Sequence, residues 1–247
     1  MRLTIKVAPA IFAIGLCLAR VAWSQTPEPL PTADEVVARM MRADDERKSE
    51  LTGYTALRRY EAVNSTRHAE LEVRLESAPD GSKSFTIISE TGSSAIRKHV
   101  LYKILSEERE ASKRESRTST RIIPANYKFE VVGLETLDSG PAYVLSVTPK
   151  TENKYFIDGK VWVDANAYAI VRIEGRPARN PSFWVHNVHF VHTYQRVGQF
   201  WLASSTRTTS EVRIFGPSEL TIDNSGYVLD PPTRRATATD PIASLTR

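Results

Sequence analysis

Three histidines, at positions 186, 189 and 192, have the spacing in this 247-residue chain that most suggests chemistry. On a helix these positions share one side, and three imidazoles gathered there could hold a metal ion. Val188, Phe190 and Val191 lie between them and Val185 just before them, and β-branched and aromatic residues of this kind favour a strand. On a strand His186 and His192 face one way and His189 the other, so the ring nitrogens do not converge. The sequence therefore predicts no metal site.

Other catalytic patterns are weak or missing in the sequence. It has no G-x-S-x-G motif, no phosphate-binding loop and no dinucleotide fingerprint. Paired carboxylates occur at Asp44-Asp45 and Glu107-Glu108, but both pairs lie in runs of charge that are typical of solvated faces. We therefore predict a protein that is not an enzyme and that needs no cofactor.

The first 24 residues have the pattern of an export signal. Arg2 and Lys6 form a positive segment without acidic residues, and the apolar run Val7–Ala19 follows it. Ala22-Trp23-Ser24 then places small residues at the −3 and −1 positions of a cut before Gln25. The apolar run is short for a membrane span, so an uncleaved anchor is the less favoured alternative. The sequence predicts a cleaved signal peptide over 1–24 and a periplasmic protein.

Removal of that segment changes the cysteine content and the net charge of the protein. The single cysteine, Cys17, lies within it, so the mature chain has no thiol for a disulfide or a thiolate metal site. Lys+Arg falls from 33 to 30 against 29 Asp+Glu, which leaves a nearly neutral protein. A neutral surface gives no electrostatic reason to bind nucleic acid. Pro-rich residues 25–31 are expected to form an extended lead-in, and residues 230–247 a polar, disordered tail.

The elements that would position a site are one helix followed by many strands. Thr32 and Glu35 form a capping box at the start of a helix predicted over 32–51. Its apolar stripe consists of Val36, Val37, Met40 and Met41. A second, shorter helix is expected within Val100–Lys113.

Most of the remaining sequence alternates apolar and polar residues with period two. Leu71, Val73 and Leu75 alternate with Glu70, Glu72 and Arg74, which predicts a strand with one buried face. Further strands are expected at Gly53–Val63, Ser84–Ser89, Tyr127–Gly133, Ala142–Thr148, Lys154–Ile157, Lys160–Asp164, Tyr168–Glu174, Ser182–Arg196, Gln199–Ile214 and Glu219–Asp223. Asp158-Gly159 is predicted to form a two-residue hairpin turn. The fold class is mainly β with α: a single curved antiparallel sheet of about 10–11 strands that forms a half-open barrel.

A curved sheet with few helices leaves part of its concave apolar face uncovered, which favours a cavity for an apolar ligand. The methionines of the first helix would adapt to acyl chains of different length. The residues predicted to line this cavity are Val37, Met40, Met41, Leu71, Val73, Leu75, Phe129, Leu145, Val147, Trp184 and Phe190.

The order of strand motifs resembles that of the LolA/LolB-like superfamily, periplasmic proteins that sort outer-membrane lipoproteins. The motifs are Asn126–Phe129, Tyr143–Lys150, Gly159–Asp164, Ile170–Gly175 and Thr193–Leu202, and the resemblance covers most of Thr32–Tyr227. It implies a half-open barrel plugged by helices over residues 32–229, with lipoprotein acyl chains in the cavity. Arg58 and Arg59 are the candidates for that family's gating arginine.

The sequence as a whole predicts an exported protein that binds lipid or lipoprotein acyl chains as a monomer. A carrier in outer-membrane lipoprotein sorting is the favoured form of this function. A sensor or regulatory domain with the same cavity would need a surface for envelope proteins. A structural envelope protein would fill its concave side and bind nothing.

Overall fold

The structure is a computed structural model of the whole chain and describes residues 29–113, 119–213 and 216–231. The predicted signal peptide and most of the predicted tail lie outside these residues. Within them, no helix is both long and apolar enough to cross a membrane.

Two helical segments lie on the sheet. Helix α1 (Ala33–Glu50) begins at the predicted capping box, where Thr32 Oγ1 accepts from the Glu35 backbone N–H and Glu35 returns to the Thr32 N–H. The second segment is a continuous helical run made of α2 (Ser94–Ile96), the π-helical stretch η1 (Arg97–Leu101) and α3 (Tyr102–Ala111). It begins six residues earlier than predicted, at a cap formed by Ser93.

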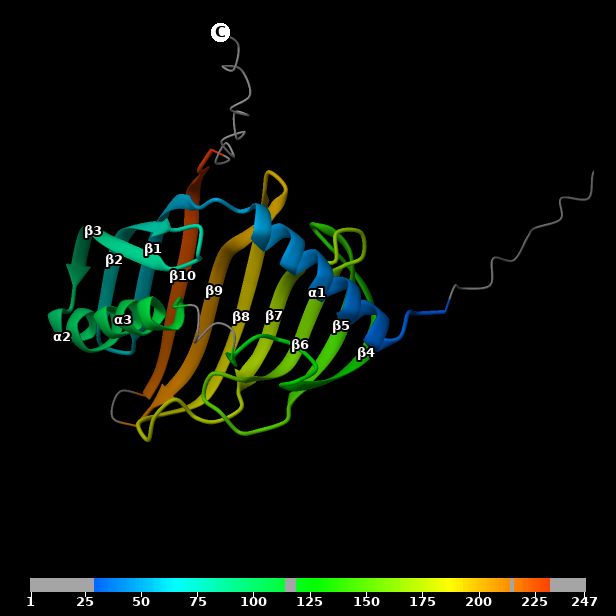
Figure 1. Cartoon of the computed structure of the whole chain (residues 1–247). Coiled ribbons are helices and arrows are strands. Elements are labelled where there is room, and N and C mark those ends of the chain that lie inside the picture. Colours follow the sequence, from blue (N-terminus) through cyan, green and yellow to red (C-terminus); the bar gives the residue numbers. More distant parts are fainter. Residues whose placement is uncertain (1–28, 114–118, 214–215, 232–247) are drawn as a thin grey trace, which may run out of the picture.

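Ten antiparallel strands form one sheet in the described part of the chain, which confirms the predicted class. They are β1 (Tyr54–Asn64), β2 (His68–Ser77), β3 (Lys83–Gly92), β4 (Tyr127–Leu137), β5 (Gly140–Pro149), β6 (Ile157–Asp164), β7 (Ile170–Pro177), β8 (Val185–Val197), β9 (Phe200–Val212) and β10 (Gly216–Leu229). Their order is β3-β2-β1-β10-β9-β8-β7-β6-β5-β4, so the first and last strands pair with each other and β3 and β4 are free edges. The sheet is curved and open (Figure 1).

The two helical segments cover different parts of the same sheet face, as Figure 1 shows: α1 crosses the strands from β4 toward β9, and α2–α3 crosses β1 to β3. A separate apolar core lies under each. The core beneath α1 joins Val37 and Met40 to residues of β4–β7. The core beneath α2–α3 contains Leu71 and Val73, and their burial confirms the alternation predicted for β2.

The prediction of a hairpin turn at Asp158-Gly159 is wrong. Both residues lie inside β6, where Gly159 pairs with Val147 on one side and Gly175 on the other. A Cβ on Gly159 would lie 2.1 Å from the carbonyl oxygen of Glu174. This glycine therefore permits the close approach of two strands rather than a turn.

The strand predicted at Ser182–Arg196 begins later, at Val185, so Trp184 lies in the turn before it. A register shift follows between His186 and His189, and Asn187 there has a positive φ of 51°. This bulge interrupts the strict alternation that placed His186 and His192 on one face.

Candidate ligand cavities

The predicted lining residues fall into separate places. One group is formed by α1 and the strands beneath it, and its members are Val37, Met40, Met41, Phe129, Leu145, Val147 and Phe190. Leu71 and Val73 lie under α2–α3, and Leu75 belongs to a third cluster with Tyr54 and Phe200. Trp184 belongs to neither covered face, since its side chain is 53% exposed and packs edge-on against Phe183. The two helices divide the concave face, so these residues fall into separate clusters in the described part of the chain.

The hollow beside α1 has a volume of about 420 Å³ and mixed chemistry. Met41 lines it, whereas Met40 is 4% exposed and also contributes to the core beneath the helix. Charged side chains share the wall, and one of them, Arg121, forms ion pairs with Asp44 and with the neighbouring Asp45. A long acyl chain would lie beside these charges, which disfavours this hollow as an apolar site.

A second cavity, of about 530 Å³, lies between η1 and α3 and strands β1 and β8–β10. Its size is in the range of ordinary ligand pockets. The wall is largely apolar, and the residues that give it this character are Ala62, Ile96, Val100, Ile104, Val185, Val188, Val212 and Leu220. Small polar groups come from Asn64, Thr208, Ser210 and Ser218, and the longer side chains of Arg67, His99 and Glu219 also line the cavity. We call this the second-helix cavity.

None of those apolar lining residues was among the predicted site residues. Val100 and Ile104 are four positions apart on a segment predicted to be helical, and this spacing was the local signal for a shared face. Val188 and Val212 become neighbours of that helix only because β8 and β9 are placed opposite it by the pairing of β1 with β10. That pairing joins residues far apart in sequence and has no local signature.

Arg58 and Glu108 fasten the helix above this cavity to the sheet. Arg58 on β1 is 4% exposed, and its Nη1 donates to both Glu108 carboxylate oxygens at 2.6 Å. Its Nε donates to Asn224 Oδ1 at 2.6 Å, and Lys83 Nζ donates to Glu108 at 2.8 Å. Arg59 points to the other face and pairs with Glu70 at the surface. Of the two candidate gating arginines, Arg58 is thus the one that contacts a helix.

The charges of this cluster are mutually stabilised. Burial raises the pKa of Glu108, but Lys83 and Arg58 outweigh it and lower that pKa to about 2. Burial lowers the pKa of the Arg58 guanidinium, and Glu108 more than reverses that shift. Burial raises the pKa of Tyr60, whose hydroxyl lies beside Arg58, to about 12. The glutamate and the arginine are therefore an ion pair throughout the ordinary pH range.

The three histidines have three different partners. His186 lies beside Glu211, His189 beside Glu174, and the His192 ring is bonded to the Thr206 hydroxyl. Burial lowers the pKa of His192 to about 4, and the charges of Lys83 and Arg58 add to that shift. His192 therefore lies neutral inside the protein near the Arg58 cluster.

No family model matches the chain, and no curated protein matches it. The structure is similar to that of a DUF1329 family protein from Desulfovibrio piger, with 13% identity and a TM-score of 0.42 over 80% of this chain and 93% of the other. It is similar to a putative outer membrane lipoprotein-sorting protein domain from Vibrio parahaemolyticus, with 13% identity and a TM-score of 0.41 over the same shares. A LolA superfamily protein from Nitrosomonas europaea gives 9% identity and a TM-score of 0.39 over 82% and 95%. Similarity at this level is no evidence for a shared ligand or a shared activity.

Proposed function

We propose that this chain is an exported, non-enzymatic protein that binds the acyl chain of a lipid or lipoprotein in the second-helix cavity. The observation that carries the proposal is the cavity itself, which is apolar, about 530 Å³ in volume and open to solvent beside a helix. An acyl chain gains free energy with each methylene that leaves water, about 0.8 kcal/mol per group. A carrier in outer-membrane lipoprotein sorting is one form of this function.

The cover of the cavity supports reversible loading. Val100, on the helix above it, is 40% exposed and leaves an edge of the cavity accessible. The helix is attached near its far end by Glu108, and nearer its start Arg97 and Tyr102 both contact Glu90 of β3 near the surface. Polar contacts near the surface are individually weak, and the other contacts of the first turns are apolar and not directional, so these turns can shift to admit a chain while the Arg58 attachment holds.

The charged groups inside the protein support a binding role rather than acid–base catalysis. Arg58 and Lys83 are both paired with Glu108, and burial lowers the pKa of His192, which holds it in its neutral form. Groups fixed in this way stabilise a helix and a sheet.

Native mass spectrometry of the protein purified from its own cell envelope tests the proposal. We expect a population heavier than the bare chain by the mass of one lipid, which gentle collisional activation removes. A folded protein that carries no lipid, and that takes up none from vesicles of envelope lipid, contradicts the proposal. N-terminal sequencing of the same sample tests export: we expect a first residue of Gln25, and a chain that begins at Met1 contradicts it.

A sensor or regulatory domain is the second candidate function. Strand β3 is a free edge of the sheet and carries Ile87 and Ile88, which are 47% and 49% exposed. An open edge with apolar side chains is suited to pairing with a strand of another protein. Cross-linking in the envelope through a photoreactive residue at Ile88 tests this candidate, and a discrete protein adduct is the expected result.

A further inference from the structure

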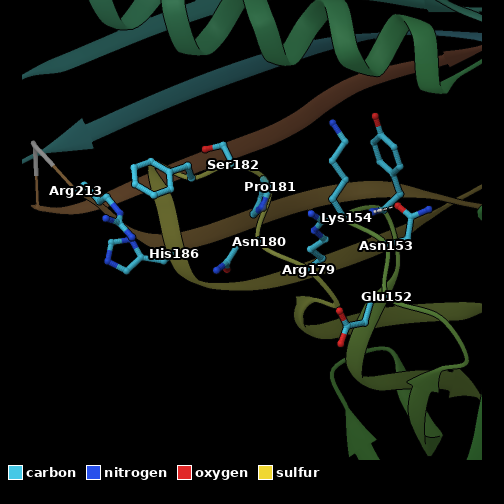
Figure 2. A pocket seen from close by; sticks show the side chains of 11 residues that line it. Glu152, Asn153, Lys154, Arg179, Asn180, Pro181, Ser182, His186 and Arg213 are labelled. Carbon is cyan, nitrogen blue, oxygen red and sulfur yellow. Dashed lines mark hydrogen bonds between the residues drawn. The ribbon is translucent and has the colours of Figure 1, made fainter.

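Another hollow, distinct from the one beside α1, lies next to the second-helix cavity at the end of the sheet. It has a volume of about 990 Å³ and is formed by residues 152–155, 179–183, His186 and Arg213 (Figure 2). Pro181 belongs to the walls of both hollows, and Val185 and Val212 of the apolar cavity immediately precede His186 and Arg213 of this one. The two spaces therefore meet at Pro181. We call the larger one the rim hollow.

The rim hollow is positively charged. Lys154, Arg179 and Arg213 line it, and no ion pair joins any of them to a carboxylate within residues 29–113, 119–213 and 216–231. The Arg213 guanidinium lies over the ring of Phe183 at 4.0 Å, and Lys154 Nζ lies over that of Tyr155 at 4.7 Å. These aromatic contacts position the two cations without neutralising their charge.

Acidic groups reduce this charge only in part. Among the residues that the structure describes, Glu152 is the one carboxylate that lines the hollow. The Tyr155 side chain raises the pKa of Lys154, and Glu107 of α3 adds to that shift from a distance. Glu211 is already engaged with Asn187 and His186. Three cations against one lining carboxylate leave a net attraction for an anion.

One polar atom in the wall also lacks a partner. Nδ1 of His186 is buried and has no hydrogen-bond partner within the part of the chain that the structure describes. A buried polar atom without a partner is costly, and a rotation of this ring toward the hollow would let an oxygen of a bound ligand satisfy it.

We propose that the rim hollow binds the phosphate of an acyl lipid whose chain occupies the second-helix cavity. A phosphate ester carries up to two charges and three acceptor oxygens, which matches several guanidinium and ammonium donors better than the single charge of a fatty acid does. The chain extends from Pro181 into the apolar cavity, and the headgroup stays in the rim hollow. This inference rests on the proposed acyl-binding function and adds the class of ligand, an anionic phospholipid.

The test compares two ligands that share one oleoyl chain, monooleoyl-glycerol phosphate and neutral monooleoylglycerol, by displacement of a fluorescent fatty-acyl probe from the whole mature protein. We expect the phosphate lipid to bind about tenfold more tightly at low salt, because charge-assisted contacts add to the same apolar burial. The preference should shrink at high salt, since exposed charges are screened.

The variant for this test replaces the three cations together, as Lys154→Gln, Arg179→Gln and Arg213→Gln. It should lose the preference and keep its affinity for the neutral lipid, which also reports that the cavity is folded.

The control variant removes the same charge from exposed positions elsewhere on the sheet, as Arg74→Gln, Lys128→Gln and Lys160→Gln. It should keep the preference, which separates the rim hollow from a general effect of net charge.

The outcomes separate this inference from the proposed function. Equal affinity for the two lipids in wild type, or equal loss in both variants, overturns the inference and leaves acyl binding standing. No displacement by either lipid contradicts acyl binding itself. Glycerol phosphate without a chain should compete weakly. If it competes as well as the lipid, the hollow is a site for a free phosphate ester and the inference is wrong.

Discussion

Arg58 on β1 and Glu108 on α3 form an ion pair in which one guanidinium nitrogen lies 2.6 Å from both carboxylate oxygens, between the sheet and the helix above it. The pair is the most deeply buried of the polar contacts that join the covering helix to the sheet, and Lys83, Arg97 and Tyr102 take part in others. Because Arg58 is almost completely buried, its charge depends on Glu108 for compensation.

Glu108→Gln should lower the free energy of unfolding by about 3 kcal/mol, because it leaves Arg58 and Lys83 inside the protein without a counter-charge. Urea denaturation measures this change. The matched control is Glu110→Gln on the same helix, where the partner Lys113 is exposed. That change should stay within about 0.5 kcal/mol. Equal losses at the two positions would show that the buried pair does not hold the helix.

His192 should make the stability depend on pH. Its pKa is about 4 in the folded protein, below the value near 6.5 of an unfolded chain. As the pH falls from about 6.5 to 4, the unfolded state takes up the proton first, so stability is lost across this window. One pKa unit corresponds to about 1.4 kcal/mol, and we expect a loss of about 2 to 3 kcal/mol. Glu108, with its pKa near 2, stays ionised throughout.

Chemical denaturation at several pH values measures this dependence. His192→Gln should flatten the decline between pH 6.5 and 4, whereas His189→Gln, on an exposed position of the same strand, should keep it. A His192→Gln protein with the wild-type pH profile would assign the decline to other groups.

Gly159→Ala should destabilise the protein by about 2 kcal/mol or more, because the new methyl group would overlap the backbone of β7. Gly133→Ala on β4 is the control, since a Cβ added to Gly133 would meet nothing within 4 Å. Thermal denaturation compares the two. If both variants melt like wild type, β6 and β7 do not approach closely enough to require a glycine.

The elements that the sequence predicted well are those with local causes. Thr32 and Glu35 cap a helix through contacts within one turn, and Leu71 and Val73 alternate with charged neighbours along a single strand. Both patterns are complete within a few residues. The number of strands followed from the same alternation.

The features that the sequence did not predict have long-range causes. Gly159 lies beside an aspartate, as in a hairpin turn, yet it is needed for a contact with Gly175, sixteen residues away. The second-helix cavity joins Ala62, Val100 and Val188, whose neighbourhood depends on the pairing of β1 with β10. No short stretch of sequence contains that information, so the predicted lining residues do not include those of this cavity.

The binding of a fluorescent fatty-acyl probe to delipidated protein tests the central claim most directly. Burial of ten methylenes gives about 8 kcal/mol before ordering costs, so we expect saturable binding at micromolar probe that unlabelled acyl chains displace. Val188→Glu places a carboxylate in the second-helix cavity and should weaken binding at least about tenfold. Met41→Glu places one in the hollow beside α1 and should leave binding unchanged. Saturable binding lost only in Val188→Glu is the predicted result. A folded protein without saturable binding, or one whose binding is lost in Met41→Glu and kept in Val188→Glu, contradicts the claim.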